Sequence, residues 1–173
     1  MTKLSDPKIY TRNLPHIQPK NAVFFLTYTL SGSLPFEKFK ILKEERDFQI
    51  RKLKREELKP EALKLSLAQK QEFYFGKFDE LLDNVICGST HLTHPEVAKL
   101  IKDSIHYLHD SSVYKVITYT LMPNHVHKII YKIQKPLFRI MQSHKGYSGN
   151  AANRILELKG QFWQPETYDH LIR

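Results

Sequence analysis

The sequence predicts an α+β fold in which helices pack on one face of an antiparallel sheet. Residues 114–121 and 125–133 are rich in β-branched and aromatic side chains, which favour strands. The dipeptide Pro123-Asn124 between them is a turn signal, so the two strands are expected to form an antiparallel hairpin. Residues 22–30 form a nearly continuous apolar run of the same composition, which predicts a central strand.

Helical segments are predicted on both sides of this hairpin. Residues 36–75 are dense in Lys, Arg and Glu, and we expect a helical insertion there, interrupted at Pro60 and followed by a connector over 76–82. The charged face of this insertion either faces only solvent or contacts DNA along its length. Apolar residues at helical spacing over 95–108 predict a core-facing helix. A last helix is expected to begin near Pro136, with a break around residues 148–150.

The ends of the chain carry weaker signals. Residues 1–20 contain three prolines, and we expect an irregular arm that packs on the domain or contacts a nucleic acid through basic side chains such as Arg12. Trp163, the single tryptophan, is expected to anchor the core. Taken together, residues 1–173 are expected to form one domain.

Composition narrows the function classes. The chain has 173 residues, of which 41% are hydrophobic, enough for a real core. It contains one cysteine, so an internal disulfide and a cysteine metal cluster are excluded. No apolar run approaches the ~18 residues of a membrane span, and the first residues lack a signal-peptide core, so we expect a cytoplasmic protein. The net charge of +9 indicates either an ordinary basic protein or one with a polyanionic partner.

Two histidines at the start of the second hairpin strand form the strongest candidate site. His125 and His127 are two positions apart, so in a strand both project from the same side. Two neutral imidazoles on one face can bind one divalent cation. The alternative is a pair of ordinary sheet residues, but a position directly after a turn is typical of site residues.

The segment Met122-Pro123-Asn124-His125-Val126-His127 resembles the signature of the HUH single-tyrosine transposases, in particular the REP-associated tyrosine transposase branch of the insertion-sequence transposase-like family. Further segments resemble that branch in the same order along the chain. They are residues 76–83, 95–108, Lys145, 151–153, Gly160 and 162–173.

The resemblance implies a ferredoxin-like sheet in which residues 22–30 lie beside the histidine strand. It also implies a metal-dependent endonuclease and strand transferase that acts in DNA transposition and recombination through a 5′-phosphotyrosine intermediate. His125 and His127 would hold Mg²⁺ or Mn²⁺, the DNA would be single-stranded or a hairpin, and the protein would form a homodimer. The basic side chains that we expect to contact DNA are Lys128, Lys145, Arg154, Arg173 and Arg12.

The sequence does not identify which tyrosine would be the nucleophile. The family carries its tyrosine in a Tyr-Ile-x-x-Asn-Pro context, which this sequence does not contain. Tyr168 and Tyr147 are the candidates downstream of the histidines. If neither acts, the chain is a truncated DNA-binding remnant or regulator without cleavage. A metal phosphoesterase acting on nucleotides is a third hypothesis, disfavoured because the sequence has no glycine-rich phosphate loop and no second histidine pair of this spacing.

Overall fold

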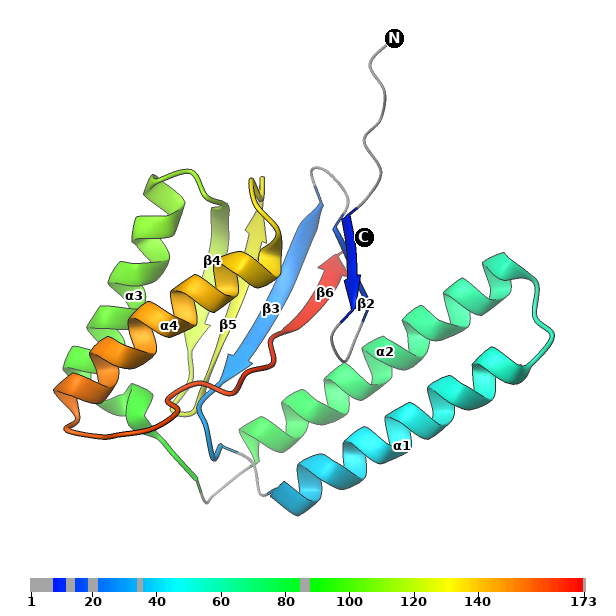
Figure 1. Cartoon of the computed structure of the whole chain (residues 1–173), viewed down its shortest axis with the longest axis horizontal. Helices are drawn as coiled ribbons and strands as arrows, with labels where there is room; N and C mark the ends of the chain where they lie inside the picture. The colour runs from blue at the N-terminus through cyan, green and yellow to red at the C-terminus, as the bar shows by residue number, and fades with distance from the viewer. Residues whose placement is uncertain (1–7, 12–14, 19–21, 34–35, 85–87, 173) are drawn as a thin grey trace, which may run out of the picture. The chain divides into compact units, whose positions relative to one another are not determined.

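Four antiparallel strands form the main sheet of the computed structural model, which describes residues 8–11, 15–18, 22–33, 36–84 and 88–172 (Figure 1). The strands are ordered β4-β5-β3-β6. Their bounds are β3 Val23–Thr29, β4 Lys115–Leu121, β5 His125–Tyr131 and β6 Tyr168–Ile172. The expected hairpin and its central neighbour are therefore confirmed.

Two helices complete the unit that contains this sheet. α3 spans Pro95–Asp110 after a short 3-10 turn at His91–Thr93, and α4 spans Leu137–Ile155. The resulting order β3-α3-β4-β5-α4-β6, with the first and third strands in the centre, is the ferredoxin-like arrangement. The predicted fold class, α+β with an antiparallel sheet, is confirmed.

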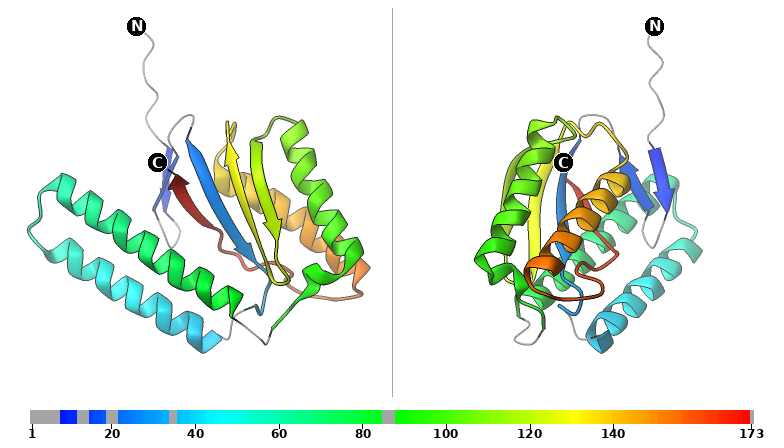
Figure 2. Two further views of the ribbon diagram at one scale, coloured as in Figure 1. Left: turned by 180° about the vertical axis from the view of Figure 1, so that it is seen from behind. Right: turned by 60° about the vertical axis from the view of Figure 1, so that its left-hand side comes forward.

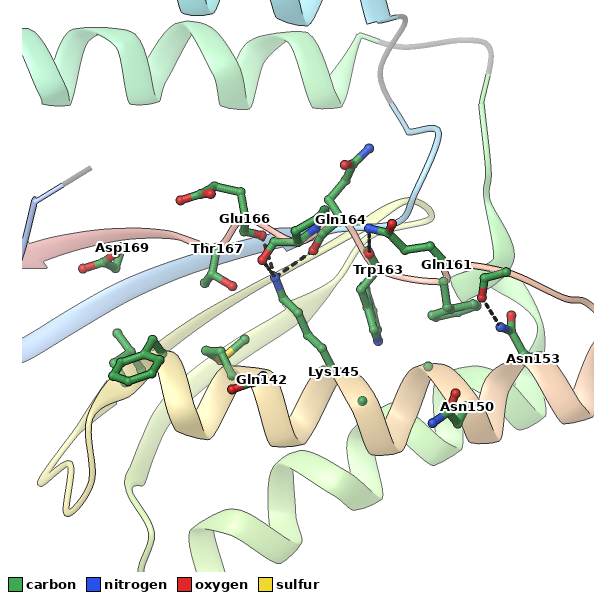
Figure 3. Close-up of a pocket in the computed structure, with 18 residues that line it drawn as sticks. Gln142, Lys145, Asn150, Asn153, Gln161, Trp163, Gln164, Glu166, Thr167 and Asp169 are labelled. Atoms are coloured by element: carbon green, nitrogen blue, oxygen red, sulfur yellow. Dashed lines mark hydrogen bonds between the residues drawn. The ribbon is translucent and has the colours of Figure 1, made fainter. Parts of the chain in front are cut away.

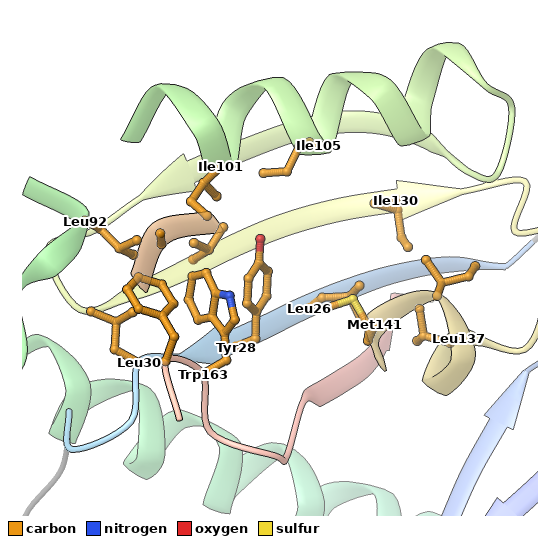
Figure 4. Close-up of a cluster of buried hydrophobic side chains, with 14 of the residues drawn as sticks. Leu26, Tyr28, Leu30, Leu92, Ile101, Ile105, Ile130, Leu137, Met141 and Trp163 are labelled. Atoms are coloured by element: carbon orange, nitrogen blue, oxygen red, sulfur yellow. The ribbon is translucent and has the colours of Figure 1, made fainter. Parts of the chain in front are cut away.

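The core lies between one face of the sheet and these two helices (Figure 4). Side chains alternate along a strand, so β3 and β5 each send every second residue into this core. The fully or almost fully buried apolar residues include Phe24, Leu26, Tyr28, Leu30, Val126, Ile130, Val97, Ile101, Ile105, Ile140, Met141 and Trp163. The intervening residues of β3 and β5, among them the two histidines, project from the opposite face.

α4 is continuous, and the break that we expected around residues 148–150 was wrong. Gly149 explains why the helix keeps a poor helix former here. A Cβ atom at Gly149 would lie 3.2 Å from both Phe162 Cβ and Trp163 Cδ1, so the glycine allows the tryptophan to pack directly against the helix backbone. Burial of Trp163 against α4 outweighs the propensity cost of about 1 kcal/mol.

Three strands were not foreseen. The arm that we expected to be irregular contains an antiparallel pair, β1 Lys8–Thr11 and β2 Pro15–Gln18. Proline is compatible with the first position of a strand, where Pro15 lies, so the prolines did not exclude this hairpin. β6 pairs with β3, from which it is separated by most of the chain. Local sequence patterns carry no information on such a partner.

A second unit, Gly32–Ser89, is described on its own. Its helices, α1 Phe36–Arg55 and α2 Pro60–Asp83, lie side by side (Figure 2). Glu45 of α1 accepts a hydrogen bond from the Tyr74 hydroxyl at 3.0 Å and lies 3.5 Å from Lys77 Nζ. The expected connector over 76–82 was wrong, because buried Tyr74, Phe78 and Leu82 at helical spacing carry α2 through Gly76. None of the helices in the described residues is long and apolar enough to span a bilayer.

Candidate metal and nucleic-acid site

Two histidines of β5 meet on the face of the sheet opposite α3 and α4. His125 is fully buried and His127 is half-buried. Their Nε2 atoms lie 2.8 Å apart, and their ring planes are inclined at 74°. The two rings therefore share one face, as their spacing in the sequence predicts.

Each ring is held through its other nitrogen. His125 Nδ1 lies 2.6 Å from Asn124 Oδ1. An amide oxygen only accepts, so Nδ1 carries a proton and the neutral ring keeps its lone pair at Nε2. His127 Nδ1 lies 2.8 Å from Thr27 Oγ1, a hydroxyl that can donate or accept. The His127 ring also stacks on Phe25 with centroids 5.2 Å apart. These contacts fix both rings with their Nε2 atoms converging.

This donor set fits a divalent cation. Two ligands at right angles around one ion, each about 2.1 Å away, lie about 3 Å from each other, close to the 2.8 Å between the two Nε2 atoms. Metal-binding histidines are typically oriented by a hydrogen bond at the second ring nitrogen, which Asn124 and Thr27 provide here. Two imidazoles leave further positions on Mg²⁺ or Mn²⁺ for water, phosphate oxygens and another protein group.

The histidine face also carries one of the two candidate tyrosines. Tyr168 of β6 pairs with Thr27 of β3, which in turn pairs with His127 of β5. Directly opposed residues of antiparallel strands point to the same side. Tyr168 therefore lies on the histidine face two strands from His127, about 10 Å away along the sheet. Tyr147 is 61% exposed on α4, which packs on the other face. The structure groups Tyr168, and not Tyr147, with the histidines.

Residues 86–170 match the family model described as "Transposase IS200 like". This part of the chain belongs to the IS200-like transposases. The match contains the histidine hairpin, α4 and the start of β6, and it confirms the family that the sequence motifs indicate. The search of curated proteins found no match.

A solved structure of a REP-associated tyrosine transposase bound to a REP hairpin is also similar. Its TM-score is 0.45 and its sequence identity is 14%, over 95% of this chain and 61% of that chain. This chain therefore spans a little under two thirds of the length of that transposase.

Lys128 is buried inside the transposase domain. We expected it to contact DNA, but its side chain is fully buried on the face opposite the histidines, so we withdraw that assignment. Its Nζ lies 3.3 Å from the Tyr114 hydroxyl and 5.2 Å from the centre of the Tyr28 ring. Burial, assisted by the positive charge of Lys145, lowers the pKa of Lys128 to about 7.

Buried polar side chains next to Lys128 form a series of hydrogen bonds within the core. The Tyr28 hydroxyl lies 3.0 Å from His144 Nε2, and the Ser104 hydroxyl lies 2.9 Å from His144 Nδ1. Burial, followed by the charges of Lys128 and Lys145, lowers the pKa of His144 well below its usual value. The Trp163 indole donates to the Ser148 hydroxyl at 2.9 Å. These contacts satisfy polar groups inside the core, so His144 is a structural histidine.

Lys145 holds the segment that leads into β6. Its Nζ donates to three backbone oxygens, at 2.9 Å to Gln164, 3.3 Å to Pro165 and 2.5 Å to Glu166 (Figure 3). An ammonium group has three protons, and these carbonyls take all three. We expected Lys145 to contact DNA, but in this conformation its hydrogen-bonding capacity is used within the protein, so that assignment is also withdrawn.

Of the remaining basic residues that we expected to contact DNA, only Arg154 lies within the described part of the chain. Arg154 is exposed in the last turn of α4 and stays available to a phosphate. Arg12 and Arg173 lie outside the described residues.

Two residues that orient the histidines were missed by the sequence analysis. Asn124 was noticed only as a turn residue, and Thr27 could not be found without the register of β3 against β5.

Replacing Thr27 with valine should weaken metal binding about 10- to 100-fold, because His127 then loses the hydroxyl that fixes its orientation. Valine nearly matches threonine in shape, so the buried position stays filled. Isothermal titration with Mn²⁺ measures the change. Thr29→Val is the matched control, a buried threonine of the same strand and face whose hydroxyl makes no hydrogen bond to either ring. Equal affinities of the two variants would contradict the role of Thr27.

Proposed function

We propose that this transposase domain cleaves one strand of DNA through a tyrosine nucleophile, with Mg²⁺ or Mn²⁺ held by His125 and His127. The observation that carries the proposal is the convergence of the two Nε2 atoms on the face that also carries Tyr168. The net charge of +9 supports a polyanionic partner, since neutralising phosphates releases counterions.

The proposed chemistry conserves the phosphodiester bond energy. The Tyr168 oxygen bonds to the scissile phosphorus and gives up its proton to water, while the bond to the 3′ oxygen breaks and that oxygen takes up a proton. The products are a 5′-phosphotyrosine link and a free 3′-hydroxyl, which can reverse the step without ATP. The cation, when bound, supplies Lewis-acid stabilisation of charge on the phosphate. His125 and His127 hold it, and Asn124 and Thr27 keep their rings oriented.

The test uses a labelled single-stranded hairpin oligonucleotide with Mn²⁺, followed by denaturing electrophoresis and peptide mapping. Wild-type protein is expected to give a covalent adduct on Tyr168, and Tyr168→Phe and His125→Ala are expected to give none. Tyr147→Phe is the matched control and should form the adduct like the wild type, because Tyr147 lies on α4 away from the histidines. An adduct that survives in Tyr168→Phe would refute the assignment of the nucleophile.

A second candidate function is DNA binding without cleavage. It is supported by the position of Tyr168, which is only half-exposed within the β-ladder. The same experiment separates the two functions. A retarded native complex without any covalent product would favour the binding function.

We also propose that the protein acts in the cytoplasm as a homodimer formed by pairing of β4 edges. β4 is an edge strand of the sheet, and its Ile117 is 58% exposed at the irregularity between Val116 and Thr118. An unpaired edge is a template for another strand, and a lysine on the edge blocks such pairing. Ile117→Lys is therefore expected to convert a dimer to a monomer in light scattering. Tyr107→Lys, at a position on α3 that is 69% exposed, should stay dimeric. A monomeric wild type would contradict the proposal.

A further inference from the structure

One row of side chains crosses all four strands of the sheet at the level of the histidines. Tyr168 of β6 pairs with Thr27 of β3, and Thr27 pairs with His127 of β5. His127 in turn pairs with Thr120 of β4. Directly opposed residues of antiparallel strands point to the same side. Thr120 therefore lies on the histidine face, one strand or about 5 Å beyond His127 and on the side away from Tyr168.

An irregularity in β4 brings a second threonine to this face. Val116 packs on the core, whereas Thr118 pairs with Ile129 of the histidine face. The extra residue between them, Ile117, moves Thr118 to the face opposite that of Val116. Thr118 and Thr120 therefore both lie on the histidine face, about 7 Å apart along β4.

The two hydroxyls are available to a ligand. Thr118 and Thr120 are exposed, and neither hydroxyl makes a hydrogen bond within the part of the chain that the structure describes. The only acidic residue in the four described strands of the sheet is Asp169, which alternation along β6 places on the face opposite Tyr168. No carboxylate of the sheet therefore repels a phosphate beside these hydroxyls. Pairing of β4 edges uses backbone groups, so it leaves both side chains accessible.

The geometry of phosphoryl transfer assigns a direction to DNA on this face. The attacking and leaving oxygens lie roughly in line, on opposite sides of the phosphorus. In the proposed function Tyr168 attacks from β6, and the scissile phosphate lies at His125 and His127. The leaving 3′ oxygen therefore points towards β4, and the nucleotide that carries it lies over Thr120.

We propose that Thr118 and Thr120 form a leaving-strand site. Their hydroxyls donate hydrogen bonds to the phosphate on the 5′ side of the nucleotide that carries the leaving 3′ oxygen. The inference rests on the proposed function, because attack by Tyr168 sets the direction of the strand. Threonine hydroxyls commonly bind phosphate oxygens and fix the register of a nucleic acid without reading its sequence. The same contacts keep the released strand, with its 3′-hydroxyl, close to the phosphotyrosine link, so that the step can be reversed.

The test uses the labelled hairpin oligonucleotide of the cleavage assay, after its cleavage position has been mapped. A methylphosphonate in place of the proposed phosphate removes the charge of that group. Binding is measured by fluorescence anisotropy without divalent cations, so that no cleavage occurs. Wild-type protein is expected to bind the methylphosphonate oligonucleotide about 10-fold more weakly than the unmodified one.

The double variant Thr118→Val with Thr120→Val should bind the unmodified oligonucleotide about 10-fold more weakly than the wild type, and the methylphosphonate should cause no further loss. Valine is β-branched like threonine, so β4 is retained. Thr120→Ser keeps a hydroxyl and should bind like the wild type.

Tyr119→Phe is the matched control, because it removes a hydroxyl of β4 on the opposite face, where Tyr119 lies 2.9 Å from His106 Nε2. It should bind both oligonucleotides like the wild type. A methylphosphonate on the 3′ side of the scissile phosphate should weaken the wild type and the double variant equally. Titration with Mn²⁺ should give the same affinity for both proteins.

The outcomes separate the leaving-strand site from the proposed function. Equal binding of the two oligonucleotides by the wild type, or an unchanged affinity of the double variant, would overturn the leaving-strand site, while an adduct on Tyr168 would leave the proposed function standing. A lower Mn²⁺ affinity of the double variant would also overturn the site, because the hydroxyls would then serve the cation. A wild type that forms no adduct would overturn the proposed function, and the leaving-strand site with it.

Discussion

Lys128→Met is expected to stabilise the transposase domain by about 3 kcal/mol at pH 7, measured by urea unfolding. The lysine is fully buried among aromatic residues, and burial lowers its pKa to about 7. Either state of this side chain therefore destabilises the folded protein at neutral pH. Burying the charged ammonium is unfavourable, and so is removing its proton far below its usual pKa. The rings of Tyr28 and Tyr114, 5.2 and 4.8 Å from Nζ, favour the charged form and reduce this cost. Methionine fills a similar volume without a charge.

The same lysine predicts how stability depends on pH. The folded pKa of Lys128 is about 7, below the value of 10.5 in the unfolded chain. Between these two values the unfolded chain binds one proton more, so the free energy of unfolding rises with pH, by at most about 1.4 kcal/mol per pH unit. His144, whose pKa is lowered by burial and by the charges of Lys128 and Lys145, acts in the same direction below pH 6.5. Lys128→Met should flatten the dependence between pH 7 and 9.5.

Lys99→Met is the control for this prediction, because Lys99 forms an exposed i,i+4 ion pair with Asp103 on α3. It should change stability by less than about 0.5 kcal/mol and leave the pH dependence as in the wild type. Measurements are kept below pH 9.5, because tyrosine hydroxyls of the unfolded chain titrate near pH 10. A wild-type stability that is constant from pH 7 to 9.5 would show that Lys128 keeps its proton in the folded protein.

The parts of the fold that were predicted correctly depend on local patterns. The hairpin of β4 and β5 is encoded by two β-rich runs around Pro123-Asn124, and β3 by its apolar run. β6 was missed because its partner β3 lies far away in the sequence. The break in α4 was predicted from two glycines, whereas Gly149 serves the packing of Trp163. Propensity alone cannot show that a tertiary contact compensates a poor helix former.

Some residues of the site could also be predicted from local patterns, and others could not. Alternation along β5 was sufficient to place His125 and His127 on one face. The same rule directs Lys128 to the opposite face, so its burial could have been predicted, and its positive charge was the misleading signal. Thr27 and Tyr168 needed the register of three strands, which the sequence does not contain.

Lys145→Met is expected to destabilise the domain by about 3 kcal/mol and to reduce adduct formation on Tyr168. The ammonium donates to the oxygens of Gln164, Pro165 and Glu166. Hydrogen bonds to charged groups contribute about 1.5–3 kcal/mol each, but water can replace part of them at this half-buried site. Because the segment leads directly into β6, its release also loosens the strand that carries Tyr168. Urea unfolding and the hairpin cleavage assay measure the two effects, with Lys99→Met as the control for both.

The effect of Lys145→Met should be larger in a protein that already carries Lys128→Met. In the wild type, loss of Lys145 relieves its repulsion of Lys128, since the charge of Lys145 contributes to the lowered pKa of that lysine. This relief offsets part of the damage from the lost hydrogen bonds. With methionine at position 128 there is no charge to relieve, so the full cost should appear in a double-mutant cycle. Additive effects would mean that the two lysines do not interact in the folded protein, and that burial alone lowers the pKa of Lys128.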